Sequence, residues 1–225
     1  MVHPRCPLRP AVFLDRDDTL IVNSALPQKA FARGVLGDLA DPASVKLISG
    51  AAQACLSLWQ AGFVLIVVTN QGVVARGGAP LEQVHATNKA LCQRLPKPTS
   101  DTDSGTQADR GSDACTSTDE SSFVTVPACD SLIERVYFCP FHPAGSIEPF
   151  AREHPWRKPL PGMILAAAED CGLDLAASWL VGDSERDVLS GIAAGLDPAR
   201  VLQIGAGGAY ADLARASAHI LGVYA

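Results

Sequence analysis

The run AVFLDRDDTL at residues 11–20 places three acids directly after a short apolar stretch that is typical of a β-strand. Asp15, Asp17 and Asp18 lie within four positions, so each negative charge opposes the ionisation of the others. A hard divalent cation would offset this cost, because Mg²⁺ prefers carboxylate and carbonyl oxygens and screens their repulsion. Mg²⁺ commonly completes its coordination with waters and a substrate phosphate. The three acids therefore indicate a site for magnesium and a phosphate group.

Polar residues follow other predicted strands as well. Thr69, Asn70 and Gln71 end or follow the run FVLIVVT, and Asp183 follows SWLVG. In an open α/β sheet, ligands bind at the carboxyl ends of the strands. These residues supply the parts of a phosphoryl-transfer site: a carboxylate that attacks phosphorus, a second carboxylate that exchanges protons, and donors to the phosphoryl oxygens. Lys158, in HPWRKPLPGM, is the lysine that would neutralise the phosphoryl charge.

The chain alternates short β-type runs with helical patterns. Near-continuous runs of Val, Ile and Leu are typical of strands that are buried on both faces of a parallel sheet. The alternation predicts a Rossmann-like, doubly wound α/β fold with a mainly parallel sheet and only short loops as its cap. Helices are expected at residues 50–61 and 81–94 and from about residue 162. The predicted strands are residues 11–15, 63–69, 133–138, 178–183, 200–205 and 219–223.

Length and composition predict one domain over residues 11–223. Residues 96–122 are rich in Ser, Thr, Asp and Gly and poor in large apolar side chains, which indicates a disordered insertion. The net charge of −6 and the pI near 5.3 argue against a nucleic-acid partner. The chain lacks an apolar run of about 18 residues, so no membrane association is expected.

The cysteines and the amino-terminal residues predict the compartment. The seven cysteines are scattered and form no CxxC pair, which fits reduced thiols better than a disulfide framework. The first 15 residues lack the apolar core of a secretory signal. We therefore expect a cytoplasmic protein, and we expect it to be a monomer.

Four segments, in order along the chain, resemble the motifs of the haloacid dehalogenase (HAD) superfamily of phosphatases: DRDDT, VVTNQ, Lys158 and VGDSERD. The segments FLDRDDTL, VVTNQGVVARG, YFCPFHPAGSIEPF and RKPLPGM resemble one branch in particular, the bacterial heptose-bisphosphate and histidinol-phosphate phosphatases. This resemblance spans residues 11–205 apart from the insertion. It implies a Mg²⁺-dependent phosphomonoester hydrolase that forms an aspartyl-phosphate and acts on a small phosphorylated metabolite. D-glycero-D-manno-heptose 1,7-bisphosphate, which would lose its 7-phosphate, is the expected substrate, and histidinol phosphate is the alternative.

The resemblance also assigns roles to individual residues. Asp15 would be the nucleophile and Asp17 the general acid and base. Asp15, the main-chain carbonyl of Asp17 and Asp183 would hold Mg²⁺, while Thr69 and Lys158 would stabilise the phosphoryl group. The residues implied to bind the substrate are Asn23, Ser24, Ala25, Leu26, Thr69, Asn70, Gln71, Gly72, Arg157 and Lys158.

Two positions depart from the family pattern. Asp18 stands where glycine is usual, and since aspartate tolerates turn conformations better than most residues, the turn is still expected to form. Many family members bind a structural Zn²⁺ through a Cys-x-His pair and a Cys-x-Cys pair. Here Cys139 alone matches, so zinc is not expected, and packing of Phe141 and Trp156 would hold this loop instead. The alternative is an open zinc site made of Cys139, His142 and His154.

The same residue types also fit two further classes of protein. A signalling receiver domain gathers acids, a threonine and a lysine at strand ends, although its phospho-acceptor lies on a later strand than its acid pair. A catalytically silent phosphosugar-binding protein would share most of the site. The role of Asp187, one turn beyond Asp183, is equally open: it is either a partner of the site or an acid that the dipole of a helix favours at its amino terminus.

Overall fold

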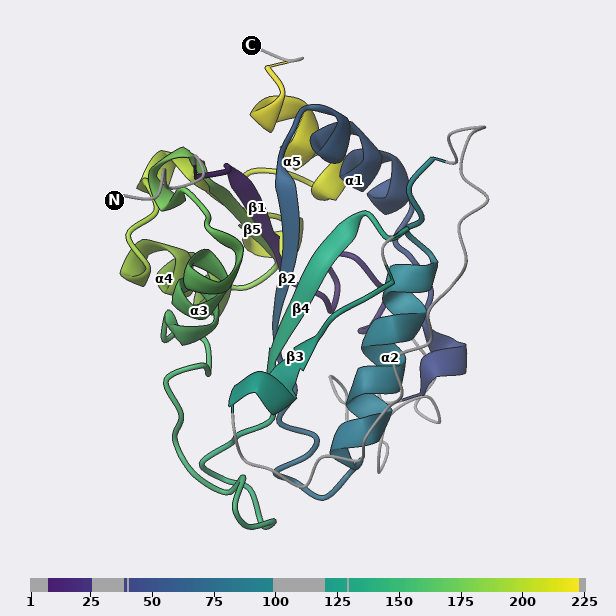
Figure 1. The fold of residues 1–225 in the computed structure, drawn as a ribbon, viewed down its shortest axis with the longest axis vertical. Helices are drawn as coiled ribbons and strands as arrows, with labels where there is room; N and C mark the ends of the chain where they lie inside the picture. The colour runs from purple at the N-terminus through teal and green to yellow at the C-terminus, as the bar shows by residue number, and fades with distance from the viewer. Residues whose placement is uncertain (1–7, 26–38, 40, 99–119, 129, 223–225) are drawn as a thin grey trace, which may run out of the picture.

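The computed structural model describes residues 8–25, 39, 41–98, 120–128 and 130–222. In this part of the chain one six-stranded sheet has the order β3-β4-β2-β1-β5-β6 (Figure 1). Five strands are parallel, and β3 pairs antiparallel with β4 at one edge, which confirms the predicted mainly parallel sheet. The strands are β1 (Ala11–Leu14), β2 (Val64–Asn70), β3 (Val124–Thr125), β4 (Ile133–Cys139), β5 (Trp179–Gly182) and β6 (Val201–Gln203).

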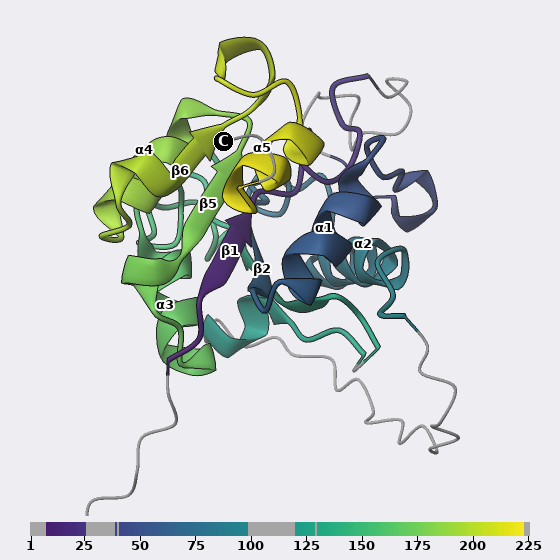
Figure 2. The ribbon, with the colours of Figure 1, turned by 90° about the horizontal axis from the view of Figure 1, so that it is seen from above.

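Helices cover both faces of the sheet, as the view from above shows (Figure 2). One face carries α1 (Ala51–Gln60), α2 (Leu81–Gln93) and α5 (Leu213–Ile220), and the other carries α3 (Gly162–Cys171) and α4 (Glu185–Ala193). The helices predicted at residues 50–61 and 81–94 and from residue 162 are confirmed. The connections also contain short 3₁₀ helices at Pro42–Ser44, Glu120–Phe123, Leu175–Ala177, Pro198–Arg200 and Gly205–Gly207.

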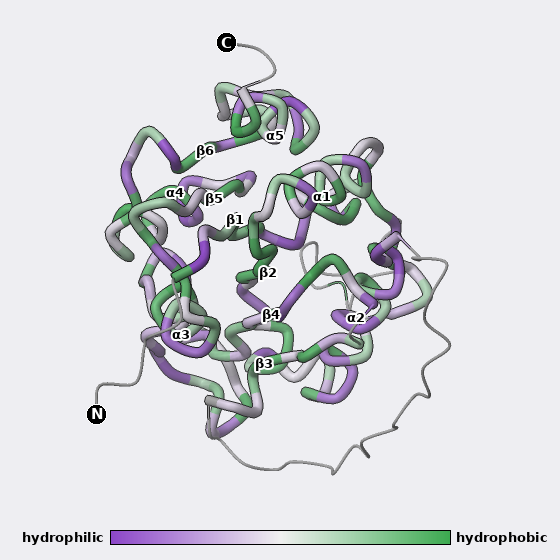
Figure 3. Tube along the Cα trace, turned by 45° about the horizontal axis from the view of Figure 1, so that its top comes forward, coloured by the Kyte–Doolittle hydropathy of each residue, from purple (hydrophilic) through white to green (hydrophobic). Residues whose placement is uncertain are grey.

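The central strand β1 is buried on both of its faces. Val12 and Leu14 pack toward α1 and α5, while Phe13 packs toward α3. All three side chains are fully buried, and Figure 3 shows β1 in green at the centre of the molecule. This two-sided burial explains the uninterrupted apolar run that precedes the acids. No helix among the described residues is long and apolar enough to cross a membrane.

The prediction of a strand at residues 219–223 is wrong for residues 219–222, and residue 223 lies outside the described residues. His219 and Ile220 end α5, and the next two residues form a turn. The side chain of Asp212 accepts a hydrogen bond from the amide N–H of Arg215 and so caps the helix. Leu213 and Ala216, three positions apart, are buried in the core cluster that includes α1. Helical periodicity and the cap therefore outweigh the short apolar run at the end of the segment.

Residues 99–119, which form most of the predicted insertion, lie outside the described residues. Both of its ends contact the rest of the fold. The amide N–H of Lys97 donates to the carbonyl of Asp130 at 2.5 Å, and Ser122 is buried beside Phe123. The structure describes residues 96–98 and 120–122 at these two ends, and the disorder predicted for the insertion stays a prediction. The edge strand β3, only two residues long, follows directly and was not predicted.

Candidate active site

The predicted polar residues meet at the carboxyl ends of three adjacent strands. Asp15 follows β1, Thr69 lies near the end of β2, and Asp183 follows β5. Because β1 lies between β2 and β5, this edge is the point where the strand order reverses, the usual ligand site of such sheets. A cavity of about 470 Å³ opens here. It is lined by Asp15, Asp17, Asp18, Asn23, Thr69, Asn70, Gly72, Arg76, His142, Arg157, Lys158, Asp183, Ser184, Arg186 and Asp187.

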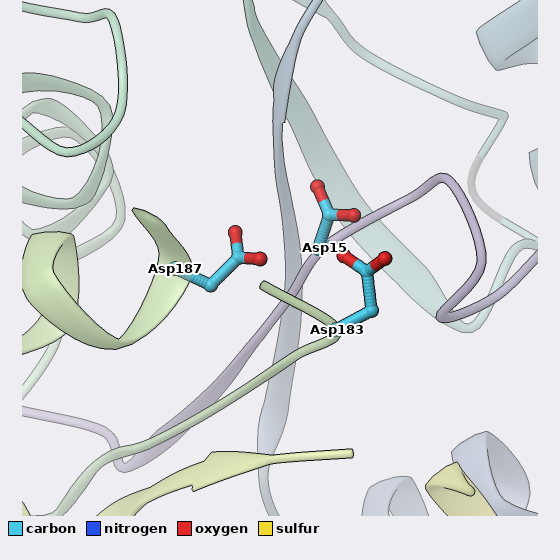
Figure 4. A group of neighbouring side chains, drawn as sticks. All are labelled: Asp15, Asp183 and Asp187. Atoms are coloured by element: carbon cyan, nitrogen blue, oxygen red, sulfur yellow. The ribbon is translucent and has the colours of Figure 1, made fainter. Parts of the chain in front are cut away.

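The ammonium group of Lys158 lies between two carboxylates. Its Nζ is 2.5 Å from Oδ1 of Asp15 and 2.5 Å from Oδ1 of Asp187. It also donates to the main-chain carbonyl of Val68 at 2.9 Å. All three charged side chains are buried. Figure 4 shows the side chains of Asp15, Asp183 and Asp187 close together, each from a different segment of the chain.

These three carboxylates carry more negative charge than Lys158 can neutralise. Burial raises the pKa of Asp15, and the nearby ammonium only partly offsets this effect. Burial, with Asp187 and Asp18 nearby, raises the pKa of Asp183 to about 6. Burial acts against the charge of Lys158, but its two carboxylate partners outweigh burial and raise the lysine pKa. The site therefore holds an ammonium ion and an unbalanced cluster of acids.

This donor set fits Mg²⁺. One ligand oxygen each from Asp15, Asp183 and Asp187 can be chosen so that all three lie within 4.8 Å of one another. Hard carboxylate oxygens are the ligands that Mg²⁺ prefers, and the cation would neutralise the remaining negative charge. Among the described residues no other group of three or more His, Cys, Asp or Glu side chains meets this spacing.

Asp187 has both of the roles left open by its position. Its Oδ2 accepts from the amide N–H and the hydroxyl of Ser184, at 3.1 and 2.6 Å, and so caps α4. Its Oδ1 pairs with Lys158. Burial acts to raise the pKa of Asp187, but this ion pair outweighs burial and lowers it. The close approach requires Gly182, since a Cβ there would lie 2.4 Å from the Cβ of Asp187. A small residue at the end of β5 thus lets the helix acid reach the site.

Asn70 anchors the segment that carries Lys158. Its Nδ2 donates to the Lys158 carbonyl at 3.1 Å, and its Oδ1 accepts from the Lys158 amide N–H at 3.0 Å. The neighbouring Arg157 donates from Nη1 to the carbonyl of Phe141 at 3.1 Å and lines the cavity. This two-point attachment of the Lys158 backbone to Asn70, 88 residues earlier in the chain, explains how the lysine reaches Asp15.

An aromatic cluster holds the loop between β4 and Lys158. The ring of Phe141 stacks on His154 with centroids 4.0 Å apart and 4° between the planes. Phe123 meets Phe141 and Trp156 edge to face. Phe141 and Trp156 are buried, so the prediction that they pack to hold this loop is confirmed. The alternative zinc arrangement of Cys139, His142 and His154 is not among the clusters that the described residues form.

The turn after β1 forms as predicted despite its aspartate. Asp18 has φ of 56°, in the left-handed region where aspartate is tolerated. Its Oδ1 accepts from the amide N–H groups of Asn23 and Ser24, both at 2.9 Å. Asn23 is buried and lines the cavity, whereas Ser24 and Ala25 are exposed and do not. The fourth residue predicted in this loop, Leu26, lies outside the described residues.

Sequence reasoning missed Arg16. This side chain is fully buried and donates to both carboxylate oxygens of Asp17. Gln71, predicted to bind substrate, does not line the cavity but contacts Arg16, Asp17 and Thr69. The available signal was an arginine between two acids, directly after an apolar run that predicts a strand buried on both faces.

Comparisons with known proteins define the class first. A family model described as HAD-hydrolase-like matches residues 155–220. The structure of a HAD-like protein from Mesorhizobium loti has a TM-score of 0.63 and 28% sequence identity, and the match covers 88% of this chain and 74% of that one. The fold and the acidic site are thus those of a HAD hydrolase, a class whose phosphatases generally use Mg²⁺.

Curated relatives narrow the class to one family. The D-glycero-beta-D-manno-heptose-1,7-bisphosphate 7-phosphatase of Yersinia pestis is 33% identical over 187 residues, which are 83% of this chain and 77% of that protein. The same enzyme of Escherichia coli K12 is 31% identical over 185 residues, covering 82% and 74%. The chain belongs to this family of HAD phosphatases and is a phosphoric monoester hydrolase. Membership favours the phosphatase over the receiver domain and the silent binder.

A further solved structure shares the fold. The D,D-heptose 1,7-bisphosphate phosphatase of B. bronchiseptica, complexed with magnesium and phosphate, has a TM-score of 0.62 and 22% sequence identity. The match covers 95% of this chain and 99% of that chain.

Proposed function

We propose that this enzyme removes the 7-phosphate of D-glycero-D-manno-heptose 1,7-bisphosphate. We further propose that it works in the cytoplasm as a monomer, with residues 11–223 acting as one domain and with no nucleic-acid or membrane partner. The names of the relatives support the substrate. The acidic chain, whose net charge is −6, supports the absence of a nucleic-acid partner.

The arginines of the cavity are the structural reason for proposing a bisphosphate as the substrate. Arg76, Arg157 and Arg186 all line it, in addition to Lys158. Burial lowers the pKa of Arg157, and the nearby Arg186 and Arg76 add to this effect through charge repulsion. A second phosphate would relieve this repulsion, because guanidinium groups bind phosphate oxygens through paired hydrogen bonds. Histidinol phosphate carries an amine where the bisphosphate has its second phosphate, and the same groups would repel that cation.

The proposed reaction has two steps. A carboxylate oxygen of Asp15 attacks the phosphorus of the 7-phosphate, the bond from phosphorus to the sugar oxygen breaks, and that oxygen takes a proton from Asp17. Asp17 then takes a proton from a water that attacks the aspartyl-phosphate, which releases phosphate and restores Asp15. Thr69 and Lys158 donate to the phosphoryl oxygens as charge develops on them. Asp187 keeps Lys158 in place for this task.

Asp15, Asp183 and the main-chain carbonyl of Asp17 would hold Mg²⁺ in the proposed site. The cation would supply the positive charge that lets a phosphate group approach these acids. We do not propose a zinc ion, because the loop that would carry it is held by the aromatic cluster.

Phosphate release from heptose 1,7-bisphosphate and histidinol phosphate, measured side by side with and without Mg²⁺, tests the proposal. We expect at least a hundredfold preference in kcat/KM for the bisphosphate, about 2.7 kcal/mol of transition-state binding. Arg157→Gln should raise KM for the bisphosphate about tenfold or more and leave kcat/KM for a sugar monophosphate nearly unchanged. Equal loss on both substrates would contradict the role of Arg157, and turnover of neither would overturn the proposed substrate.

A further inference from the structure

Arg16 has no part in the proposed reaction, yet its guanidinium contacts the residue that exchanges the proton. We propose that Arg16, held by Gln71 and Asn88, is a positioning residue that fixes the carboxyl group of Asp17 for proton transfer to the leaving group. This inference rests on the proposed function, because it requires Asp17 to be the proton donor.

The first observation is how fully the carboxyl group of Asp17 is fixed. Arg16 donates from Nε to Oδ1 and from Nη2 to Oδ2, each at 3.1 Å. Gln71 donates from Nε2 to Oδ2 at 2.9 Å. Two parallel hydrogen bonds from one guanidinium set the plane of a carboxylate as well as its position. Asp17 nevertheless lines the cavity, with 16% of its side chain exposed.

The second observation is that Arg16 is itself held rigidly. Its side chain is fully buried, and a buried guanidinium is tolerated only when its donors are hydrogen-bonded. Nη1 donates to Oδ1 of Asn88 in α2 at 2.9 Å, and Nη2 donates to Oε1 of Gln71 at 2.8 Å. An exposed ion pair between neighbouring residues would contribute little to stability. Here the buried side chain of Arg16, which follows β1, also bonds to α2 and to the residue after β2.

The third observation concerns what orients Asn88. Nε2 of His85 lies 3.0 Å from the carbonyl of Ser122, so this nitrogen carries the hydrogen. Nδ1 of His85 then accepts from the hydroxyl of Thr125 at 2.8 Å. The oxygen of Thr125 can therefore accept from Nδ2 of Asn88, at 3.4 Å. The Oδ1 of Asn88 therefore faces Arg16, and each hydrogen bond in the series from Ser122 to Arg16 has one donor and one acceptor.

A positioning role predicts a dependence on the leaving group that general destabilisation does not. An alkoxide needs a proton as it leaves, whereas 4-nitrophenolate departs without one. The quantity to compare is kcat/KM, because it covers the steps up to departure of the leaving group. General acid catalysis contributes about 10²- to 10⁴-fold to such reactions. Misplacing Asp17 should therefore slow an alkyl phosphate strongly and 4-nitrophenyl phosphate weakly.

The experiment measures kcat/KM of the full chain for a sugar phosphate, heptose 1,7-bisphosphate, and for 4-nitrophenyl phosphate. Asn88→Leu removes the acceptor of Arg16 without touching the cavity, and Asn88→Asp keeps an acceptor there. Thr87→Ala, at the adjacent residue of α2, is the matched control, since within the described part of the chain its hydroxyl donates to the Gln83 carbonyl of its own helix and to no group of the site. Asp17→Asn sets the full size of the leaving-group effect. Arg16→Lys is a second test, provided that it folds by circular dichroism.

We expect Asn88→Leu to lower kcat/KM about tenfold or more for the sugar phosphate and less than threefold for 4-nitrophenyl phosphate. Asn88→Asp and Thr87→Ala should stay within threefold of the wild type on both. Equal losses on the two substrates, or no loss in Asn88→Leu while Asp17→Asn shows the leaving-group effect, would overturn the positioning role alone. A wild-type protein inactive on both, or an Asp17→Asn variant without that effect, would overturn the proposed function and this inference with it.

Discussion

Replacement of Phe141 tests whether aromatic packing, rather than a metal, holds the loop that delivers Arg157 and Lys158. The ring of Phe141 is fully buried and stacks on His154 at 4.0 Å. It also meets Phe123 edge to face at 5.3 Å, and the guanidinium of Arg152 lies 4.8 Å from its centroid. The alanine variant would remove all of these contacts at once.

The expected cost follows from this burial. Phe→Ala at a buried position costs about 3–5 kcal/mol, because the lost transfer free energy is joined by that of a cavity. In a protein of this size each kcal/mol lowers Tm by about 2–4 °C, so Phe141→Ala should lower Tm by about 6–20 °C. Phe141→Leu keeps most of the volume and should cost less than about 1.5 kcal/mol. Activity should also fall, because a loosened loop would move the main-chain carbonyl of Phe141, which accepts a hydrogen bond from Arg157.

Urea unfolding and calorimetry of the wild type, Phe141→Ala and Phe141→Leu measure these costs. Leu189→Ala, on the exposed side of α4, is the control and should stay within about 0.5 kcal/mol of the wild type. A metal analysis of the purified protein, with and without a chelator, completes the assay. A loss below about 1 kcal/mol in Phe141→Ala would refute the reasoning. So would about one equivalent of zinc per chain whose removal lowers Tm.

Three further predictions concern the acidic edge of the sheet. Asp18→Gly keeps the left-handed turn but removes the acceptor of the amide N–H groups of Asn23 and Ser24. We expect the loss of loop order to cost about 1 kcal/mol of substrate binding, seen as about a fivefold rise in KM with kcat nearly unchanged. A fall in kcat alone would contradict this role. Gly182→Ala places a Cβ 2.4 Å from Asp187, so Asp187 must move away from Lys158. We expect kcat to fall at least about a hundredfold. Near-normal kinetics would show that the contact between Asp187 and Lys158 is not needed. Because the pKa of Asp183 is raised to about 6 in the metal-free protein, protons compete with Mg²⁺ below that pH, and the raised pKa of Asp15 adds to this competition. Calorimetric titration should therefore find Mg²⁺ binding at least about tenfold weaker at pH 5 than at pH 8, whereas equal affinities would mean that Asp183 does not bind the metal.

The limits of prediction are clearest in two short elements. The apolar run at residues 219–223 has the composition of a strand, but the cap at Asp212 lies seven residues earlier and belongs to a helix. The edge strand β3 was missed because its two residues are paired only by β4, a partner that the local pattern does not reveal. A local cap and helical periodicity decided the first element, and pairing with another strand decided the second.

At the active site, the residue types and their order along the chain determined most of the chemistry. Apolar strands that end in Asp15, Thr69 and Asp183 already indicate a phosphate and magnesium site, because parallel strands present their carboxyl ends along one edge. The turn at Asp18 and the packing of Phe141 were also predictable, since they depend on local backbone preference and on side-chain size.

The tertiary structure alone decided which charges meet. Lys158 reaches Asp15 because Asn70 holds its backbone, Asp187 reaches Lys158 because Gly182 leaves room for it, and both pairings join distant parts of the chain. Arg16 could be read as a surface charge until its burial against α2 was known. Hydrogen bonding and electrostatic pairing depend on distances of a few ångströms between folded segments, and the order of residues along a chain does not specify such distances.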